Sequence, residues 1–429
     1  MAKYFGTDGI RGVAGEDLTA RVAFALGNAL CRLREKPRVV LGRDTRPSSP
    51  MLALALAAGV ASGGGKVLDG GVLPTAAVAF FVRREGADFG AVVSASHNPA
   101  RYNGLKLFDE NGCKLSERAE ERAEKFFGDY LHAPSLSCGV RVPLRGKGAY
   151  ADSLAEDADL RGKTFVLDCA FGAAGRVAPA LFRRLGAKVI ALNCSGDGRR
   201  INDGCGALYP ASVCRAVRET GADAGFCYDG DSDRLIACDE RGNIVDGDKV
   251  LCIFARELHR AGKLTGGIAV GTAHTNSGVE RALAREGITL LRTDVGDKYV
   301  AECMRRTGAA VGGEQSGHVI LAARTTTGDG ILTSVRLAAL LRGRRLSELS
   351  DFPLFPQYNL SVTVKDKVRV LGNAQVQAAC EREKAGVARL IVRASGTEPV
   401  VRIFAEAEDV RAAKAACERV RRAVALAEK

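Results

Sequence analysis

Residues 39–68 read VVLGRDTRPSSPMLALALAAGVASGGGKVL and set out a strand, a helix and the next strand in order. The apolar run Val39 to Leu41 predicts a short strand. Ser49-Pro50 predicts the start of a helix that reaches about Ala61, because serine caps helices and proline fits the first turn. Gly63-Gly64-Gly65 then ends the helix, and Val67-Leu68 begins the next strand. Strands that are apolar throughout and alternate with helices indicate a parallel sheet covered on both faces.

The same alternation of strand and helix recurs along the chain. The first unit continues with a helix over 75–83 and a strand over 90–93. Two further units each show a strand, a helix and a strand; they cover 165–167, 177–185 and 189–192, and 268–270, 279–285 and 289–291. The C-terminal region differs, because strands at 360–364, 390–392 and 400–404 precede one long amphipathic helix over 410–426. The sequence therefore predicts four domains: 1–147, 148–247, 248–355 and 356–429.

The composition narrows the class of protein. Of the 429 residues, 46% are hydrophobic and 26% are charged, as in ordinary globular proteins, which excludes extensive disorder. No apolar run approaches the ~20 residues of a transmembrane helix, and the N-terminus lacks an apolar signal segment, so a cytoplasmic protein is expected. The 13 cysteines lack the short spacings of zinc sites and are expected to be reduced thiols.

The net charge of +12 indicates a negatively charged partner. Nucleic acid, an anionic membrane and a small anionic substrate all fit that charge. Nucleic-acid binders usually cluster their basic residues or present stacking aromatics, whereas aromatics are only 6% here and the longest basic cluster is Arg342-Gly343-Arg344-Arg345. The dispersed charge therefore favours a small phosphorylated molecule, and neither a nucleic acid nor a membrane is expected as partner.

A polar loop, Ser94-Ala95-Ser96-His97-Asn98-Pro99, directly follows the predicted strand over 90–93. Ligands of open parallel sheets bind beyond the carboxyl ends of the strands, so this loop is well placed. The Ser96 hydroxyl offers a nucleophile or a phosphoryl carrier, and His97 offers a donor beside it. Lys106 adds a cation that could neutralise phosphate or move a proton. The alternative is a Ser/Asn-Pro turn with a capping role only.

An acidic loop, Asp229-Gly230-Asp231-Ser232-Asp233-Arg234, follows the apolar segment 224–227. Three carboxylates at alternate positions converge when the backbone turns around a cation, and all-oxygen ligation suits Mg²⁺ or Ca²⁺ rather than zinc. An EF-hand does not fit, because Arg234 stands where its sixth position requires glycine. The alternative is a solvated acidic turn, which the mutual repulsion of three acids after a buried strand disfavours.

Two loops with glycine complete the set. Gly312-Gly313-Glu314-Gln315-Ser316-Gly317-His318 offers groups for sugar hydroxyls beside an imidazole, or it is a plain glycine loop. Arg393-Ala394-Ser395-Gly396-Thr397-Glu398-Pro399, with Arg402 close behind, offers guanidinium forks for a phosphate monoester, or it is a capped turn. The turn-rich N-terminus adds Arg11. A hydroxyl carrier, a metal loop, a sugar loop and a phosphate clamp are together what phosphoryl transfer on a sugar phosphate requires.

These motifs, in this order and with the opening Tyr4-Phe5-Gly6-Thr7-Asp8-Gly9-Ile10-Arg11-Gly12, resemble the α-D-phosphohexomutases over essentially the whole chain. The resemblance implies an α/β fold with three mixed-sheet domains and a smaller C-terminal α+β domain around a central cleft. It implies an isomerase in which a phosphoserine donates its phosphoryl group to a sugar phosphate. The resulting bisphosphate turns around in the cleft and phosphorylates the serine again. The phosphate clamp must accept either end of the sugar, so we expect it on a mobile domain.

The resemblance also assigns roles to individual residues. Ser96 would be the modified residue, a phosphoserine, and would complete the Mg²⁺ site with Asp229, Asp231 and Asp233. The residues expected around the transferring group are Arg11, His97, Lys106, Arg234 and His318, with Lys106 and His318 as general acid and base. Those expected to bind sugar hydroxyls are Glu314 and Ser316. Those expected to bind the non-reacting phosphate are Arg393, Ser395, Gly396, Thr397 and Arg402.

The opening motif, Gln315 and the run Thr325-Thr326-Thr327-Gly328-Asp329-Gly330 indicate the branch of the family that acts on glucosamine phosphates. Its members would convert glucosamine 6-phosphate to glucosamine 1-phosphate through glucosamine 1,6-bisphosphate, for UDP-N-acetylglucosamine synthesis. A homodimer is compatible with this reading. The branch acting on glucose and mannose phosphates is the alternative. Positions that depart from the usual family pattern are Tyr102, Phe171, Ala207, Ser232 and Lys298.

Three functions of other kinds stay open on the sequence alone. In a phosphatase, water rather than sugar would discharge phosphorylated Ser96, and phosphate release would not depend on a bisphosphate. A non-catalytic protein would bind metal or sugar phosphate even after Ser96→Ala. A nucleic-acid binder would show steeply salt-dependent binding to duplex DNA.

Overall fold

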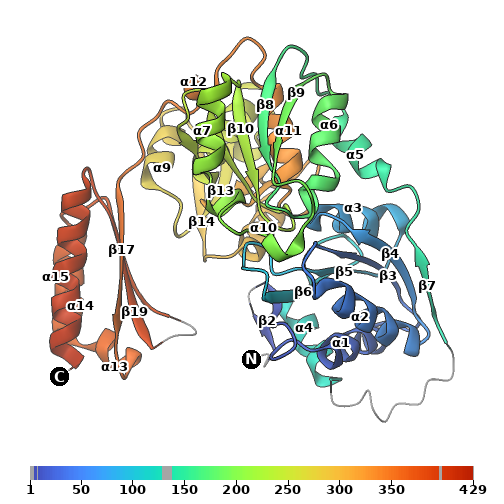
Figure 1. Ribbon diagram of the computed structural model, residues 1–429. Coiled ribbons are helices and arrows are strands. Elements are labelled where there is room, and N and C mark those ends of the chain that lie inside the picture. The colour runs from blue at the N-terminus through green and yellow to red at the C-terminus, as the bar shows by residue number, and fades with distance from the viewer. Residues whose placement is uncertain (1–3, 7, 128–137, 396–398, 429) are drawn as a thin grey trace. The chain divides into compact units, whose positions relative to one another are not determined.

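The computed structural model describes residues 4–6, 8–127, 138–395 and 399–428 (Figure 1). The chain forms two compact units: unit 1 consists of residues 1–274 and 288–351, and unit 2 of residues 275–287 and 352–429. Unit 1 contains three sheets and unit 2 a fourth, smaller one. This composition confirms the expected class of three mixed α/β sheets followed by a smaller C-terminal domain. The four predicted domain limits stay a prediction.

The first sheet has seven strands in the order β1-β2-β6-β5-β3-β4-β7. Its strands span Phe5–Gly6 (β1), Gly9–Val13 (β2), Arg38–Arg43 (β3), Lys66–Val72 (β4), Phe89–Val93 (β5), Tyr102–Phe108 (β6) and Val140–Pro143 (β7). The helices of this region span Ala20–Leu33 (α1), Ser49–Ser62 (α2), Thr75–Glu85 (α3) and Glu117–Lys125 (α4). Buried leucines and valines of α1, α2 and β3 form the core on one side of the sheet.

The predicted strands and helices of this region are confirmed, with two corrections. The expectation of a parallel sheet is confirmed for β3, β4 and β5, whereas β6, a strand that the local pattern did not predict, runs antiparallel to β5 and makes the sheet mixed. The connection from β5 to β6 is too short for the crossover that a parallel neighbour needs. The second correction concerns the start of α2. Ser48 holds the N-cap position, and Ser49 is the first helical residue, whose hydroxyl donates to Asp44.

The second sheet carries the acidic loop. Its strands follow the order β12-β11-β10-β8-β9, with β8 parallel to β9 and β10 and with β11 antiparallel to β10. They span Thr164–Asp168 (β8), Lys188–Leu192 (β9), Ala224–Tyr228 (β10), Leu235–Asp239 (β11) and Ile244–Val245 (β12). The accompanying helices span Gly148–Ala155 (α5), Ala178–Arg184 (α6) and Ala211–Thr220 (α7). Residues 229–234 connect two fully buried antiparallel strands, so the acids leave the core at a hairpin.

The third sheet carries the glycine loop proposed for sugar hydroxyls. Its order is β14-β13-β15-β16, and only β16 runs antiparallel to its neighbour. The strands span Ile268–Thr272 (β13), Thr289–Thr293 (β14), Val311–Gly313 (β15) and Val319–Leu321 (β16). The helices span Gly247–Arg260 (α8), Asp297–Thr307 (α10), Gly330–Ala339 (α11) and Leu346–Leu349 (α12). Residues 314–318 turn the chain between β15 and β16.

Unit 2 is an antiparallel sheet with helices; the three strands and the long helix that the C-terminal pattern predicts are confirmed, and three shorter helices accompany them. Its order is β17-β19-β18, and α15 lies along the sheet (Figure 1). Its elements span Ser277–Ala284 (α9), Gln357–Thr363 (β17), Lys367–Gly372 (α13), Ala374–Lys384 (α14), Arg389–Ala394 (β18), Val400–Glu406 (β19) and Val410–Glu428 (α15). Helix α9 belongs here because Ser277 donates to Glu406 and Asn276 donates to the Phe355 carbonyl. The buried face of α15 recurs at helical spacing: Ala413, Ala416, Cys417, Val420 and Val424.

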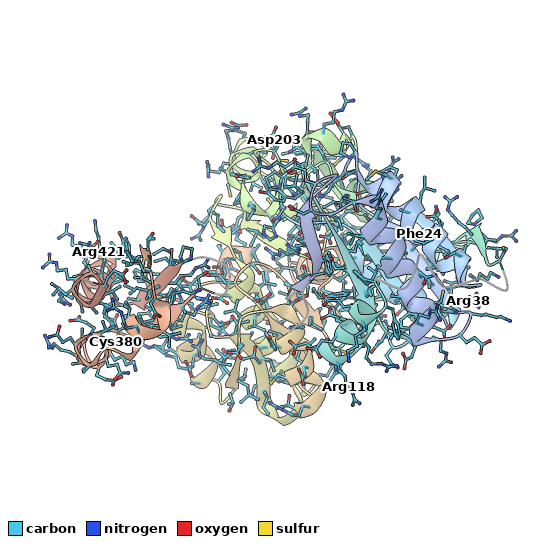
Figure 2. All side chains as sticks on the ribbon, turned by 90° about the horizontal axis from the view of Figure 1, so that it is seen from below. Phe24, Arg38, Arg118, Asp203, Cys380 and Arg421 are labelled. Atoms are coloured by element: carbon cyan, nitrogen blue, oxygen red, sulfur yellow. The ribbon has the colours of Figure 1, made fainter. Side chains whose placement is uncertain are left out.

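Charged side chains such as Arg118 and Asp203 are exposed on the surface (Figure 2). All 13 cysteines are free thiols, and most of them are buried. Among the helices that the structure describes, none has both the length and the apolar character that crossing a bilayer requires.

Candidate active site

Ser96 lies in a tightly held loop between β5 and β6. Its backbone adopts φ +53°, in the left-handed region that non-glycine residues rarely occupy, and Ser94 Oγ accepts its N–H at 2.9 Å. The Ser96 side chain is buried and donates to Asp229 Oδ2 at 2.5 Å. His97 Nδ1 lies 3.4 Å from the same hydroxyl. The fold therefore brings the predicted phosphoryl carrier against the predicted metal loop, 133 residues further along the chain.

The carboxylates of Asp229, Asp231 and Asp233 are buried together, with one oxygen of each within 4.8 Å of the others. Two buried oxygens, Asp231 Oδ1 and Asp233 Oδ1, accept no hydrogen bond from any described residue. A buried carboxylate oxygen without a donor is costly, and a cation at this point would satisfy both. The residues present therefore fit a divalent metal with oxygen ligands.

Lys106 from β6 holds the other oxygens of the same acids. Its ammonium donates to Asp231 Oδ2 at 2.8 Å and to Asp233 Oδ2 at 2.9 Å, and Asp8 Oδ2 lies at 3.3 Å. Burial alone would lower the pKa of Lys106, but the three carboxylates raise that pKa well above its ordinary value. Lys106 is thus a fixed positive charge beside Asp8 and two acids of the acidic loop.

A chain of alternating charges continues from Lys106 through residues that the sequence motifs did not single out. The Lys114 ammonium bridges Asp8 and Asp297. Asp297 at the start of α10 then lies 3.3 Å from His318 Nε2. Burial favours protonation of both acids, yet the neighbouring cations hold the pKa of Asp8 well below its ordinary value and also lower that of Asp297. The ion pairs of Lys114 therefore link the region of the first sheet, which contains Asp8, to the region of the third sheet, which contains Asp297.

Replacing Lys114 by methionine is expected to lower the free energy of unfolding by about 3 kcal/mol, because Asp8 and Asp297 would lose the buried cation between them. The matched control is Lys125→Met on the exposed side of α4. Urea unfolding of both variants, followed by circular dichroism, measures the difference. Equal midpoints for the two variants would show that the bridge contributes nothing to stability.

His318 is oriented by the threonine and glycine run at 325–330. The Gly328 N–H donates to His318 Nε2 at 2.8 Å, so Nε2 is the acceptor of this hydrogen bond and Nδ1 is the nitrogen left to donate. Only glycine fits at position 328, because a Cβ there would come within 2.4 Å of the imidazole ring. Nδ1 lies 4.0 Å from Asp233 Oδ2, which directs His318 toward the acidic loop.

Seven of the sixteen predicted site residues line one cavity of unit 1, with a volume of about 430 Å³. The predicted residues on its wall are Arg11, His97, Asp233, Arg234, Glu314, Ser316 and His318. Asp8 and Asp297 line it as well. Burial, Arg234 and Arg11 together lower the pKa of His97 to about 4, so its imidazole is neutral near pH 7. Burial raises the pKa of Glu314, whose Oε1 accepts the Gly296 N–H at 3.2 Å.

The predicted phosphate clamp lies in unit 2. Arg393 on β18 and Arg402 on β19 are directly opposite each other in the antiparallel register, and both are exposed. Ser395 is buried, and its carbonyl accepts from Lys367 Nζ at 2.7 Å. Gly396 and Thr397 lie outside the described residues. Two adjacent guanidinium groups on one sheet suit a phosphate monoester.

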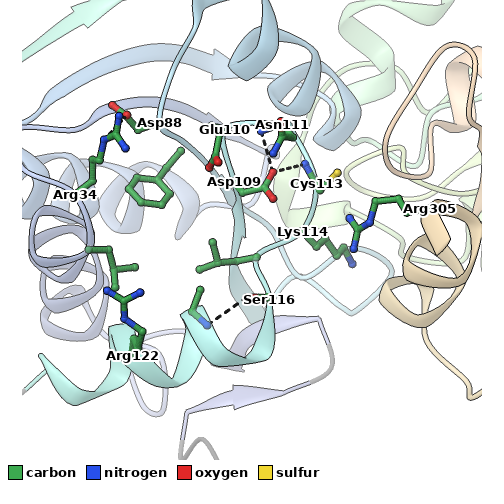
Figure 3. Close-up of a pocket in the computed structure, with 14 residues that line it drawn as sticks. Arg34, Asp88, Asp109, Glu110, Asn111, Cys113, Lys114, Ser116, Arg122 and Arg305 are labelled. Atoms are coloured by element: carbon green, nitrogen blue, oxygen red, sulfur yellow. Dashed lines mark hydrogen bonds and ion pairs between the residues drawn. The ribbon is translucent and has the colours of Figure 1, made fainter.

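A separate cavity of about 680 Å³ contains none of the predicted site residues (Figure 3). Its wall includes Asp109, whose carboxylate accepts the backbone N–H groups of Asn111 and Cys113. Lys114 lines this cavity too, although its ammonium is bound to the acids of the charge chain. Among the described contacts of this cavity, nothing matches the chemistry of the four motifs.

Sequence reasoning missed several residues of the site. Asp8 lies in the opening motif but carries no predicted role, and Asp297, next to Lys298, belongs to none of the motifs. Lys114 carries no local signal, because its two partners come from distant segments. Arg46 follows the carboxyl end of β3, a position that could have drawn attention to it, but its hydrogen-bond partners come from a distant segment and carry no local signal.

Four domains of one family match the chain in order. They are described as phosphoglucomutase/phosphomannomutase alpha/beta/alpha domain I (residues 2–131), domain II (148–242), domain III (246–354) and the C-terminal domain (359–423). The chain belongs to the phosphoglucomutase/phosphomannomutase family. It is therefore an isomerase of the phosphohexomutase type.

Similar proteins place the chain within this family. It is 46% identical to a phosphoglucosamine mutase of Symbiobacterium thermophilum over 96% of both chains, and 43% identical to one of Geobacillus thermodenitrificans over 98% of both. A crystal structure of a phosphoglucomutase/phosphomannomutase family protein from Burkholderia thailandensis is 28% identical, with a TM-score of 0.85 over 100% of this chain and 98% of that one. The Aspergillus fumigatus N-acetylphosphoglucosamine mutase, solved with GlcNAc-6P and magnesium, shares the fold at 18% identity, with a TM-score of 0.69 over 100% of this chain and 96% of that chain. The two phosphoglucosamine mutases favour the glucosamine branch over the glucose and mannose branch.

Proposed function

We propose that this phosphohexomutase interconverts glucosamine 6-phosphate and glucosamine 1-phosphate through phosphorylated Ser96 and glucosamine 1,6-bisphosphate. The observation that carries the proposal is the Ser96 hydroxyl, 2.5 Å from Asp229 of the buried acidic triad. The next residue, His97, and another acid of the triad, Asp233, line a cavity large enough for a monosaccharide. The relatives named phosphoglucosamine mutase support the choice of substrate.

In the first transfer, the free sugar hydroxyl oxygen would attack the phosphorus of phosphoserine 96. A new O–P bond forms as the bond from phosphorus to Ser96 Oγ breaks, and the hydroxyl proton passes to a base of the site. The second transfer is the reverse reaction on the other phosphate of the reoriented bisphosphate. Mg²⁺, held by Asp229, Asp231, Asp233 and a phosphoserine oxygen, would supply positive charge that stabilises the charge developing on the leaving serine oxygen.

The cations of the site would stabilise the phosphoryl oxygens during both transfers. Arg11 and Arg234 line the cavity, and Lys106 remains protonated among its carboxylates. Neutral His97 and the Nδ1–H of His318 would add hydrogen bonds to the same group. Lys106 and His318 are both donors in this arrangement, which suits the role of general acid. The assignment of the base between them stays a prediction.

Binding of the remainder of the substrate would come from two other loops. Glu314 and Ser316 would accept and donate hydrogen bonds with the sugar hydroxyls. Arg393, Ser395 and Arg402, together with Gly396 and Thr397, would bind the phosphate that does not react. Since either phosphate must occupy this clamp in turn, it is expected to bind both ends of the bisphosphate. We further propose that the protein is cytoplasmic and that it forms a homodimer. Size-exclusion chromatography with light scattering would test the homodimer.

The substrate assignment is tested by comparing glucosamine 6-phosphate, glucose 1-phosphate and mannose 1-phosphate with Mg²⁺ and a trace of the matching bisphosphate. We expect kcat/KM for glucosamine 6-phosphate to exceed the other two by about tenfold or more, the size of discrimination that one substituent supports. A higher kcat/KM for glucose or mannose phosphate would overturn the substrate and keep the family. Release of inorganic phosphate without isomerisation would instead indicate a phosphatase.

A further inference from the structure

Arg46 is a completely buried arginine in the loop between β3 and α2, with none of its surface exposed. All five N–H donors of its guanidinium are used. Its Nε donates to Asp44 Oδ2 at 2.8 Å. The other four hydrogen bonds go to backbone carbonyls of one segment: Ser96 (2.9 Å), Asn98 (2.7 Å), Pro99 (2.5 Å) and Tyr102 (3.0 Å).

Three of these carbonyls belong to the loop that presents Ser96, and the fourth, that of Tyr102, is at the start of β6. A loop with φ +53° at Ser96 does not form the regular hydrogen bonds of a strand or helix, so its buried carbonyls need donors from elsewhere. The guanidinium supplies them from a single rigid plane, and the loop therefore wraps around it. Lysine would keep the charge but has only three donors on one nitrogen and cannot reproduce this fork.

The orientation of Arg46 is itself fixed. Asp44, also completely buried, accepts Arg46 Nε through Oδ2, and its Oδ1 accepts the Arg46 backbone N–H at 3.0 Å and the Ser49 hydroxyl at 2.6 Å. In addition, Asn202 Nδ2 donates to the carbonyls of Ser96 at 2.8 Å and Asn98 at 3.0 Å. The Ser96 carbonyl is thus held between donors from the first and second sheets.

We propose that Arg46, held by Asp44, is the positioning residue that sets the Ser96 oxygen in line for phosphoryl transfer. Being fully buried, it cannot touch the substrate, so it acts through the backbone of Ser96. This inference rests on the proposed role of Ser96 as phosphoryl carrier. A misplacement of about 1 Å at a reacting atom can cost about 100-fold in rate, and loss of the fork would allow such a displacement.

The test compares Arg46→Lys with Arg101→Lys in the purified full chain with Mg²⁺ and glucosamine 6-phosphate. Arg101 belongs to the same loop, but it is exposed, and its guanidinium contacts the neighbouring Tyr102, whose hydroxyl accepts from it at 3.1 Å. We expect Arg46→Lys to lower kcat by about 100-fold and to change KM by less than about twofold, because substrate binding groups are untouched. Arg101→Lys should retain the wild-type kcat. Equal kcat values for the two variants would overturn the proposal.

Hydrogen exchange at the amides of residues 96–102 provides a readout that does not depend on turnover. Faster exchange in Arg46→Lys than in Arg101→Lys is expected, and unchanged exchange would contradict the proposed role of Arg46. A wild-type chain with no mutase activity would refute the proposed function, while the exchange result would still decide the role of Arg46. If Arg46→Lys does not fold, Asp44→Asn keeps every Arg46 donor and is expected to lower kcat by about tenfold, as loss of a supporting hydrogen bond does. An unchanged kcat in Asp44→Asn would then overturn the inference.

Discussion

Replacing Ser96 by alanine is expected to reduce kcat by about 10⁴-fold or more, the scale of losing a covalent nucleophile. The phosphoryl group would be attached to Ser96 Oγ, which contacts the acidic triad at Asp229. The other serine of this loop, Ser94, has its Oγ hydrogen-bonded to the Ser96 N–H instead. The measurement is the rate of glucosamine 1-phosphate formation, together with the intact mass of the protein after incubation with the bisphosphate. The wild-type chain should gain one phosphoryl group, and Ser96→Ala none.

Ser195→Ala is the matched control, because Ser195 is an exposed serine of the same unit. It should keep the wild-type rate and the phosphoryl mass. Turnover retained by Ser96→Ala would mean that the phosphoryl group does not pass through this serine. Loss of turnover with continued binding of the sugar phosphate is the expected pattern, and it separates an enzyme from a non-catalytic binding protein.

The second large effect is expected for Asp231→Asn. Asp231 Oδ2 accepts from Lys106 Nζ at 2.8 Å and from Thr75 Oγ1 at 2.7 Å, so the asparagine must turn its oxygen toward these donors. Its NH₂ group then takes the place of Oδ1, the buried oxygen that has no donor among the described residues. An amide NH₂ cannot bind a cation, so the metal site loses one ligand. We expect kcat to fall by about 10²- to 10³-fold, as for loss of one strong electrostatic group.

Asp203→Asn, at an exposed position of the same sheet region, is the control and should leave the rate unchanged. Calorimetric titration with Mg²⁺ should show weaker binding for Asp231→Asn than for Asp203→Asn. Chelation by EDTA should stop the wild-type enzyme, and added Mg²⁺ should restore it. Near-normal turnover of Asp231→Asn would remove the metal assignment from this loop.

Much of the fold was predictable because local patterns and tertiary packing agree. The apolar segments at 39–41, 67–68 and 90–93 became β3, β4 and β5, since a strand buried on both faces needs apolar residues at every position. The antiparallel direction of β6 was not predicted. Its direction depends on the length of the loop between β5 and β6, which is too short for a parallel crossover.

The residues of the site likewise fall into those that the sequence predicted and those that it did not. Ser96, the three acids and Glu314 to His318 were found in the sequence, because each group lies in a short loop after a strand and its chemistry is local. Lys114 and Arg46 were not found, because their roles depend on partners from other parts of the chain. Lys114 forms its two ion pairs only because the fold brings Asp8 and Asp297 together. Arg46 holds the Ser96 loop only because four backbone carbonyls converge on its guanidinium.

The sequence by itself therefore determined the family, the order of the four functional loops and the kind of chemistry each can support. Side-chain type and local periodicity depend only on residues that are close in sequence, so both can be read from the sequence. Only the tertiary structure decided which charges neutralise one another and which donor holds the Ser96 backbone. Electrostatic and hydrogen-bond energies depend on distance and burial, and residues more than 100 positions apart acquire both only when the sheets have packed.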